Sequence, residues 1–242
     1  MLQPCQDNYS TTFDSYERMR RYHEKESAES LWRRCKVNEL HIEPLDKLSP
    51  LYETPSAFAA GVSRASIEDT AENLGLALQV EGAYYPVRST AYKSLLDRAK
   101  INGTALPKLS RQKLASVLND CLALYSAETL LLIRDEKISA THSGDSMDYS
   151  VLPIDELLKV LTRKLDDRFA GNVFQGGYCD HALAVASWSM PGQKEDLLGA
   201  YAKLLESKKK TALAAKLVPS IRFVTSDTGV ASAKVSAMLE GT

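Results

Sequence analysis

The sequence predicts an α+β protein, made mostly of antiparallel sheet with packed helices and preceded by a helical N-terminal segment. Three observations lead to this class. Short apolar runs joined by turn residues alternate with amphipathic stretches from about residue 66 onward, as in hairpins set between helices. The chain has 242 residues, 44% hydrophobic and 25% charged, which is enough apolar material for a substantial core. Residues 10–36 carry aromatic and apolar side chains at helical spacing.

The N-terminal quarter predicts an arm that is separate from the core. We expect residues 10–36 to form one long helix or two short ones. Arginines interleave there with acidic residues, which indicates either a solvated helix face or an arm that contacts nucleic acid or a partner. Three prolines and several serines over residues 44–65 predict irregular connection. The expected organisation is therefore a helical arm and irregular linker over residues 1–65, followed by an α+β core domain over residues 66–242.

Caps and turns predict the elements of the core. The Glu81-Gly82 pair predicts one hairpin, and the polar turn Asp135-Glu136-Lys137 predicts another. Strands over residues 173–174 and 182–188 are expected to join through Gly176-Gly177, and a last hairpin is expected to turn at Asp227-Thr228-Gly229. The expected helices begin at Ser66, Ser89-Thr90, Ser110, Pro153 and Lys194, and the last of them ends at Lys210.

Charge and cysteine usage narrow the class of protein. The formal net charge is −1, so the strong basic excess of many nucleic-acid-binding proteins is missing. None of the four cysteines forms a CxxC pair, so the sequence predicts neither a zinc ribbon nor a thioredoxin-type redox motif. Cys121 lies in an apolar helical pattern and is expected to be a buried reduced thiol. The first residues lack a secretory signal pattern, and the longest apolar runs reach about five residues against the ~20 of a membrane span. We expect a cytoplasmic protein without membrane association.

Motifs for catalysis or cofactor binding are missing from the sequence. It contains no glycine-rich phosphate loop, no GxSxG elbow and no HExxH. Cys179, Asp180 and His181 are neighbouring metal-ligand types, but adjacent residues of a strand point to opposite faces and do not converge. We therefore predict a non-catalytic protein with no cofactor and no metal.

Polar residues gather where two of the predicted strands end. THSGDSMDYS follows one return strand, and SDTG forms the last turn. Loops at strand ends often carry binding groups, whereas Asp and Ser before Gly also form Asx-turns that need no ligand. If the two loops meet, they form a small polar pocket, and an enzyme that uses it stays open as a third alternative. The candidate pocket residues are His142, Ser143, Asp145, Ser226 and Asp227.

Basic residues near the end of the predicted helix 194–210 form a second candidate site. Cations at a helix C-terminus complement its dipole, which accounts for some of them without any ligand. The functional alternative is a phosphate-binding stripe with tyrosines as stacking platforms for bases. The candidate nucleic-acid-binding residues are Arg134, Lys137, Lys208, Lys209, Lys210 and Arg222.

Two segments resemble a known family. Residues 130–161, LLLIRDEKISATHSGDSMDYSVLPIDELLKVL, and residues 220–239, SIRFVTSDTGVASAKVSAML, are similar to the phage- and plasmid-borne family catalogued as domain of unknown function 932. The similarity covers residues 70–240, although the loop SATHSGDSMDYS is longer than the family pattern. The matching positions are Arg134, Ser143, Tyr149, Asp155, Arg222, Phe223, Ser226, Asp227 and Gly229.

The resemblance implies a gene carried by a mobile element and brings no established activity. Together with the strand-rich C-terminal region and the Lys/Arg cluster, it leads us to expect a non-catalytic phage- or plasmid-type binding protein. Its expected partner is nucleic acid, with single-stranded DNA as the specific candidate, in the host cytoplasm if the gene belongs to a phage. The alternative is a mobile-element effector that binds and inhibits a host defence protein complex. The oligomeric state stays open.

Overall fold

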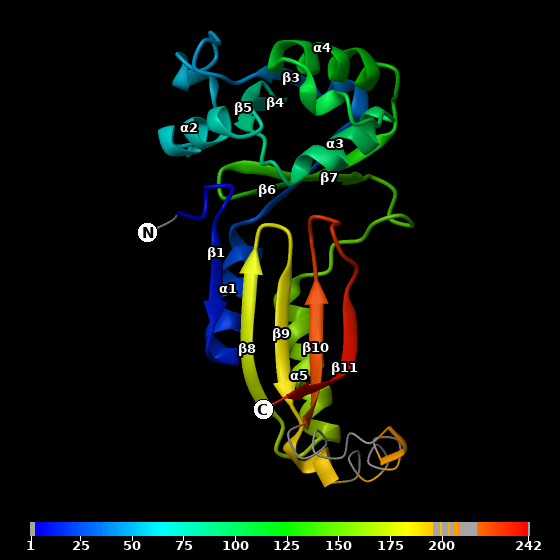
Figure 1. Ribbon diagram of the computed structural model, residues 1–242. Coiled ribbons are helices and arrows are strands. Elements are labelled where there is room, and N and C mark those ends of the chain that lie inside the picture. Colours follow the sequence, from blue (N-terminus) through cyan, green and yellow to red (C-terminus); the bar gives the residue numbers. More distant parts are fainter. Residues whose placement is uncertain (1–2, 196–198, 200–202, 204–205, 209–216, 242) are drawn as a thin grey trace. The chain divides into compact units, whose positions relative to one another are not determined.

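A computed structural model describes residues 3–195, 199, 203, 206–208 and 217–241 (Figure 1). The chain divides into two compact units, each assembled from separate stretches of sequence. Both combine helices with antiparallel strand pairs, so the predicted α+β class is confirmed. The first unit comprises residues 1–10, 28–151 and 180–182, and the second comprises residues 11–27, 152–179 and 183–242.

The first unit contains two three-stranded sheets, ordered β2-β6-β7 and β3-β4-β5. Both predicted hairpins form, with turns at Glu81-Gly82 and at Asp135-Glu136. All four turn residues have positive φ, from 48° to 86°, which is the backbone geometry of a two-residue hairpin turn. The strands are β2 (Leu31–Lys36), β3 (His41–Pro44), β4 (Leu76–Val80), β5 (Ala83–Pro86), β6 (Glu128–Arg134) and β7 (Lys137–Ser143).

Three α-helices complete the first unit, close to where the sequence predicts them. Ser63 and Ser110 cap two of these helices, because each hydroxyl accepts a backbone N–H three residues on. Leu95 and Leu118, both buried, pack with Leu131 of the sheet in one apolar core. The helices are α2 (Arg64–Glu72), α3 (Ala91–Ala99) and α4 (Arg111–Leu122), with short 3₁₀ turns at η1 (Val37–Glu39), η2 (Pro55–Ala57) and η3 (Leu106–Lys108).

The second unit is built on a five-stranded sheet in the order β1-β8-β9-β10-β11. Two helices cover one face of this sheet, as Figure 1 shows. Met19 and Leu158 from the helices pack with Trp188 of the sheet, and all three are fully buried. The elements are β1 (Ser10–Phe13), α1 (Tyr16–Glu29), α5 (Ile154–Arg168), β8 (Val173–Asp180), β9 (Ala184–Ser189), η4 (Pro191–Gln193), β10 (Leu217–Thr225) and β11 (Lys234–Gly241).

The predicted helical N-terminal segment is wrong. The described chain begins with strand β1, helix α1 covers only the middle of residues 10–36, and β2 takes the end. Leu31–Lys36 pairs along its whole length with β6, about a hundred residues away in sequence. Helical spacing of apolar residues does not reveal such a long-range pairing. The residues expected to form an arm are consequently distributed over both units.

Gly176 and Gly177 lie inside β8 and do not form the turn predicted for them. The chain turns instead between Asp180 and Ala184, and β8 carries a register shift at its glycines. A Cβ atom on Gly177 would lie 2.5 Å from the Met19 Sδ atom, so glycine lets α1 approach the strand closely. Most of the helix predicted over residues 194–210 lies outside the described residues.

Candidate functional site

A polar pocket lies in the first unit, at the end of the β2-β6-β7 sheet. Its volume is about 640 Å³, within the range of small-molecule sites. The end of α3, the connection from α4 to β6 and the loop after β7 contribute to its wall. Two residues predicted from sequence, Ser143 and Asp145, are part of the lining. The full set is Val37, Arg98, Lys100, Tyr125, Ala127, Glu128, Ser143, Gly144, Asp145, Ser146 and Asp148.

The loop after β7 is held by its own hydrogen bonds. The Ser143 hydroxyl donates to Asp148 Oδ2 at 3.1 Å and accepts from the Asp145 backbone N–H at 3.2 Å. Asp145 Oδ1 in turn accepts from the Met147 N–H at 2.9 Å, which is the bond of an Asx-turn. The carboxylates of Asp145 and Asp148 therefore have a local structural role, and both residues are exposed at the pocket.

Two cations from the end of α3 also line the pocket. Arg98 lies in the last turn of the helix, and Lys100 follows as its C-cap with a left-handed φ of 54°. Cations there complement the negative end of the helix dipole. The Arg98 Nε atom is buried, and within the described residues it has no hydrogen-bond partner. Since an unpaired buried N–H costs about 1–3 kcal/mol, this guanidinium is suited to an added acceptor.

Carboxylates accompany these cations around the pocket. Glu128 pairs with Arg34 at 2.8 Å, and the same guanidinium donates to the Gly144 carbonyl. In the described part of the chain, neither Asp145 nor Asp148 forms an ion pair. The pocket thus offers cations and hydrogen-bond acceptors together, which fits a ligand that carries both an anionic group and N–H donors.

His142 lies beside the pocket and does not line it. Its imidazole stacks on the Tyr149 ring, with 3.6 Å between centroids and 3° between planes. The Trp32 ring lies 5.9 Å from His142, so three rings from β2, β7 and the following loop pack together. His142 is buried in this stack. The geometry gives His142 a packing role and leaves the pocket to its neighbours.

Ser226 and Asp227, the other two predicted pocket residues, belong to the second unit. The Ser226 hydroxyl accepts from the backbone N–H groups of Thr228 at 3.3 Å and Val230 at 3.2 Å. These bonds fix the turn between β10 and β11, as expected for a serine at such a position. Ser226 therefore has a structural role in its own unit.

The residues of the predicted basic stripe differ in exposure, and two of them lie outside the described residues. Arg222 on β10 and Lys208 are exposed, whereas Lys209 and Lys210 lie outside the described residues. Arg134 donates to the Ser30 hydroxyl at 2.9 Å. Lys137 is fully buried, which corrects its assignment to a phosphate-binding surface, because a sealed ammonium does not reach a phosphate.

Lys137 belongs instead to a buried ion network of the first unit. Its Nζ atom contacts Asp7 Oδ1 at 3.0 Å and Asp69 Oδ2 at 2.5 Å. The equally buried Arg88 guanidinium lies 3.8 Å from Asp7 and 3.8 Å from Asp135. Arg88 also donates to the backbone carbonyls of residues 4 and 6. The network ties the N-terminal segment to the β6–β7 hairpin.

The pKa of Asp7 lies below its usual range in this network. Burial alone would raise it, but the Lys137 ammonium and the hydrogen bond from the Ser89 N–H, at 2.8 Å, outweigh burial. Nothing in the sequence pattern indicated the network, because its members are distant in the chain. Its residues are Asp7, Asp69, Arg88, Asp135 and Lys137.

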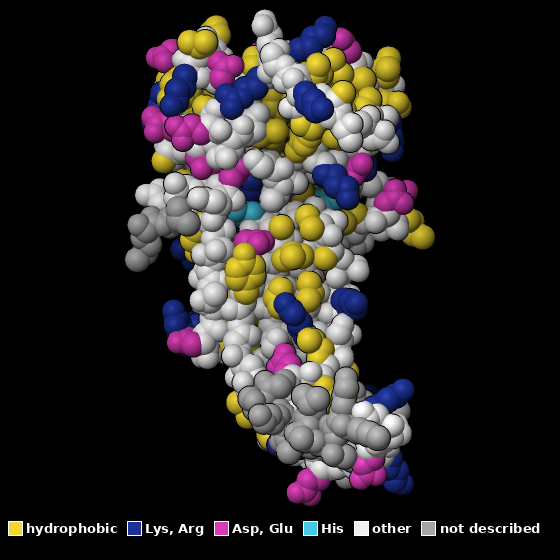
Figure 2. Space-filling model, viewed as in Figure 1, with side chains coloured by type: hydrophobic (Ala, Val, Ile, Leu, Met, Phe, Trp, Pro, Cys, Tyr) yellow, Lys and Arg dark blue, Asp and Glu magenta, His cyan; other side chains and the backbone are white. Residues whose placement is uncertain are grey.

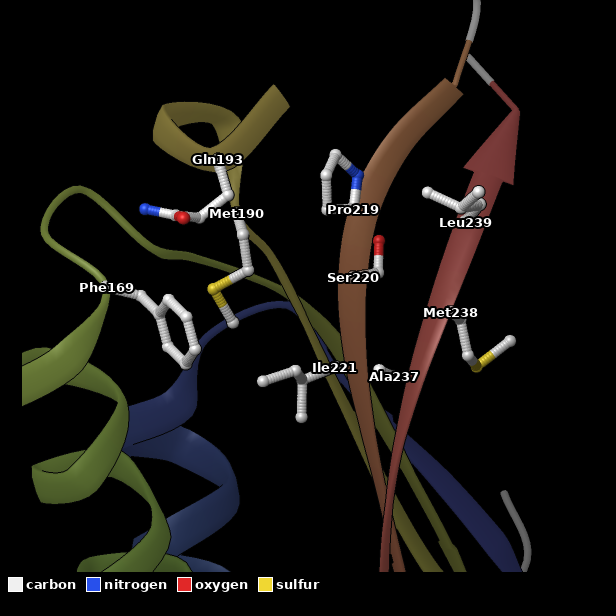
Figure 3. A pocket seen from close by; sticks show the side chains of 9 residues that line it. All are labelled: Phe169, Met190, Gln193, Pro219, Ser220, Ile221, Ala237, Met238 and Leu239. Carbon is white, nitrogen blue, oxygen red and sulfur yellow. The ribbon is translucent and has the colours of Figure 1, made fainter. Parts of the chain in front are cut away.

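An apolar pocket of about 340 Å³ lies in the second unit (Figure 3). Phe169 at the end of α5 and Ile221 on β10 point toward Met190, as the close-up shows. Met238 and Leu239 of β11 also belong to its lining. The lining offers few polar groups for orienting a ligand.

Comparison with known proteins finds no match to a family model, a curated protein or a solved structure. The resemblance to the domain of unknown function 932 therefore stays a prediction that rests on the residues quoted for it. Within the described residues, no helix combines the length and the apolar character needed to cross a bilayer.

Proposed function

We propose that the protein is a non-catalytic nucleic-acid-binding protein, with single-stranded DNA as the candidate ligand and the polar pocket of the first unit as the contact site. One observation carries this proposal. The lining of a single cavity combines Arg98 and Lys100 with Asp145 and Asp148, and it also includes the ring of Tyr125. In that set, the cations match a phosphate, the carboxylates match the edge of a base, and the tyrosine ring matches the face of a base.

The two cations would take a backbone phosphate. Arg98 is half-buried and Lys100 is exposed, and both side chains belong to the pocket lining. Guanidinium and ammonium groups are the usual protein partners of phosphate oxygens. Other cations are scattered: on the described part of the face in Figure 2, Lys and Arg side chains are mixed with Asp and Glu side chains. The proposal therefore rests on a local site and not on a broad basic surface.

The carboxylates would read the base. Asp145 and Asp148 accept hydrogen bonds, as needed for the amino groups of an unpaired base. Tyr125 supplies a ring for stacking, which is worth about 1–3 kcal/mol per base. Catalysis is not part of the proposal, since the described residues of the lining include no histidine and the adjoining His142 is stacked on Tyr149.

Fluorescence anisotropy with a short labelled single-stranded DNA tests the proposal. With two phosphate contacts, the slope of log Kobs against log salt is expected to be about −1.4 for a single strand. The double variant R98Q/K100Q should weaken binding about tenfold or more and flatten the slope. Lys93, exposed on the same helix, provides the matched control K93Q. Absence of salt-dependent binding, or an equal loss in K93Q, would contradict the proposal.

A second candidate is the mobile-element effector that inhibits a host protein complex. It is favoured by β11, the last strand in its sheet, where Val235 is 54% exposed. An edge strand with exposed apolar side chains can pair with a strand of another protein. If the protein binds a purified host complex and the R98Q/K100Q variant binds it with the same affinity, that result favours this candidate over nucleic-acid binding.

A further inference from the structure

A second group of reactive side chains lies in the second unit, away from anything used above. His23 and Glu26 come from α1, and Cys179 comes from β8. One ligand atom from each lies within 4.8 Å of the others. His23 and Cys179 are both buried, and the Glu26 side chain is only 13% exposed. Imidazole, thiol and carboxylate are three kinds of metal ligand brought into one small volume.

The fold explains why these three side chains meet. His23 and Glu26 are three residues apart and so lie on the same face of α1. Gly177 and Cys179 are two residues apart on β8 and so point to the same face of the strand. Because Gly177 has no side chain, Met19 reaches the strand backbone, and α1 is held close to Cys179.

The hydrogen bonding of the His23 ring is incomplete. His23 Nδ1 lies 3.1 Å from Glu26 Oε2, and the Tyr22 hydroxyl donates to Glu26 Oε1 at 2.9 Å. The other ring nitrogen, Nε2, is buried and has no hydrogen-bond partner within the described residues. A native interior rarely leaves such an atom unpaired, so this imidazole retains capacity for one more interaction.

We propose that His23, Glu26 and Cys179 bind one divalent transition-metal ion of the zinc class. Zinc accepts nitrogen, sulfur and oxygen ligands at about 2.0–2.3 Å in tetrahedral geometry, which places ligand atoms roughly 3–4 Å apart. Side-chain rotations that close the present separation by about 1 Å would bring the three ligand atoms into range, and a water molecule would take the fourth position. A neutral imidazole, a thiolate and a carboxylate bring two negative charges, so the bound ion forms a neutral unit suited to burial. The thiol proton is released to solvent on binding.

Another cysteine provides the comparison within the same chain. Cys35 is half-buried, and burial together with Glu39 and Glu81 raises the pKa of its thiol to about 11. A thiol that resists ionisation is a poor metal ligand. His41 is an exposed histidine paired with Glu43. Cys35 and His41 are therefore matched controls for Cys179 and His23.

Cobalt titration of the metal-free 242-residue protein tests the site independently of nucleic-acid binding. We expect one equivalent of Co²⁺ to bind with thiolate charge-transfer absorption, and Zn²⁺ to displace it. C179S should remove this absorption and C35S should retain it. H23N and E26Q should each weaken binding about tenfold or more, while H41N leaves it unchanged.

Thermal unfolding of the same proteins separates loss of metal binding from misfolding of a variant. Zn²⁺ should raise the melting temperature of the wild type and of C35S but not that of C179S. Circular dichroism establishes that C179S is folded before the titration is read. The proposal is overturned if the wild type binds no stoichiometric Co²⁺, if C179S keeps the charge-transfer absorption, or if Zn²⁺ leaves the wild-type melting temperature unchanged.

Discussion

Lys137 in the first unit and His23 in the second are both buried polar side chains, but they differ in the completeness of their contacts. The Lys137 ammonium contacts two carboxylates, and one of them also faces Arg88. The His23 imidazole has one nitrogen next to Glu26 and, among the described residues, no hydrogen-bond partner for the other. The paired ammonium indicates a structural element, whereas the half-paired imidazole indicates capacity for a ligand.

The chemistry of each group follows from this difference. Removing one member of a paired buried network leaves its partners with a buried charge that is no longer balanced. Mutations in such a network therefore lower the stability of the protein. An ion bound by His23, Glu26 and Cys179 adds ligand bonds to side chains that already lie close together, so such a group acts on binding. The Lys137 network is therefore best tested by mutations and stability measurements, and the His23 group by titration with metal ions.

Replacing Lys137 by Met is expected to have the largest effect. The substitution leaves the carboxylates of Asp7 and Asp69 together without their shared cation, and we expect a loss of about 3–5 kcal/mol in the free energy of unfolding. Urea denaturation measures it. The control K47M breaks the exposed Lys47–Glu72 pair and should cost less than about 1 kcal/mol. If K137M lost as little free energy of unfolding as K47M, the buried network would contribute no more to stability than a surface ion pair, and the prediction would be wrong.

Truncating one core leucine in each unit separates the two cores. Leu118 and Leu158 are both fully buried, and either change to Ala should cost about 2–5 kcal/mol through lost burial and a cavity. Hydrogen exchange should show the greater loss of protection in α4 for L118A and in α5 for L158A. Equal loss in both helices for both variants would show that the cores do not respond separately.

Acid should weaken the first unit through Asp7, with a smaller effect than K137M because only one carboxylate is neutralised. The folded pKa of Asp7 lies below the unfolded value of about 3.9, so its contribution is present above about pH 4 and is lost as pH falls toward the folded pKa. Stability curves between about pH 6 and 3 should therefore be flatter for D7N than for the wild type. An identical acid slope in D7N would exclude this role.

The smallest expected effect is at the cap of α4. The Ser110 hydroxyl accepts from the Lys113 N–H at 3.3 Å, and S110A should cost about 1 kcal/mol. S110N keeps an acceptor at this position and should restore most of the stability, measured by thermal unfolding. A loss in S110N equal to that in S110A would assign the effect to packing around α4.

Local signals predicted the elements whose causes are local. The turns at Glu81-Gly82 and Asp135-Glu136 and the cap at Ser110 form where the sequence places them. Residues 31–36 were predicted as helix, yet they form β2 because their partner is β6, which residue spacing does not reveal. The glycines of β8 look like a turn in sequence, but they serve the close approach of Met19.

The sequence likewise predicted only part of the candidate site. Ser143 and Asp145 were expected from their position after a strand, and they line the pocket. Arg98 and Lys100 were missed, since cations at the end of a helix have a sufficient local explanation in the helix dipole. Lys137 was predicted to join Arg134 in a phosphate-binding stripe, but in β7 its side chain is fully buried.

The chain has two tryptophans, and one falls in each unit. Trp188 is buried in the core of the second unit, and Trp32 lies half-buried in the ring stack of the first. Replacing one by Phe leaves the emission of the other as the sole indole signal. The protein therefore contains a separate optical reporter for each unit, and two single-tryptophan variants are enough to follow the two unfolding reactions without any added label.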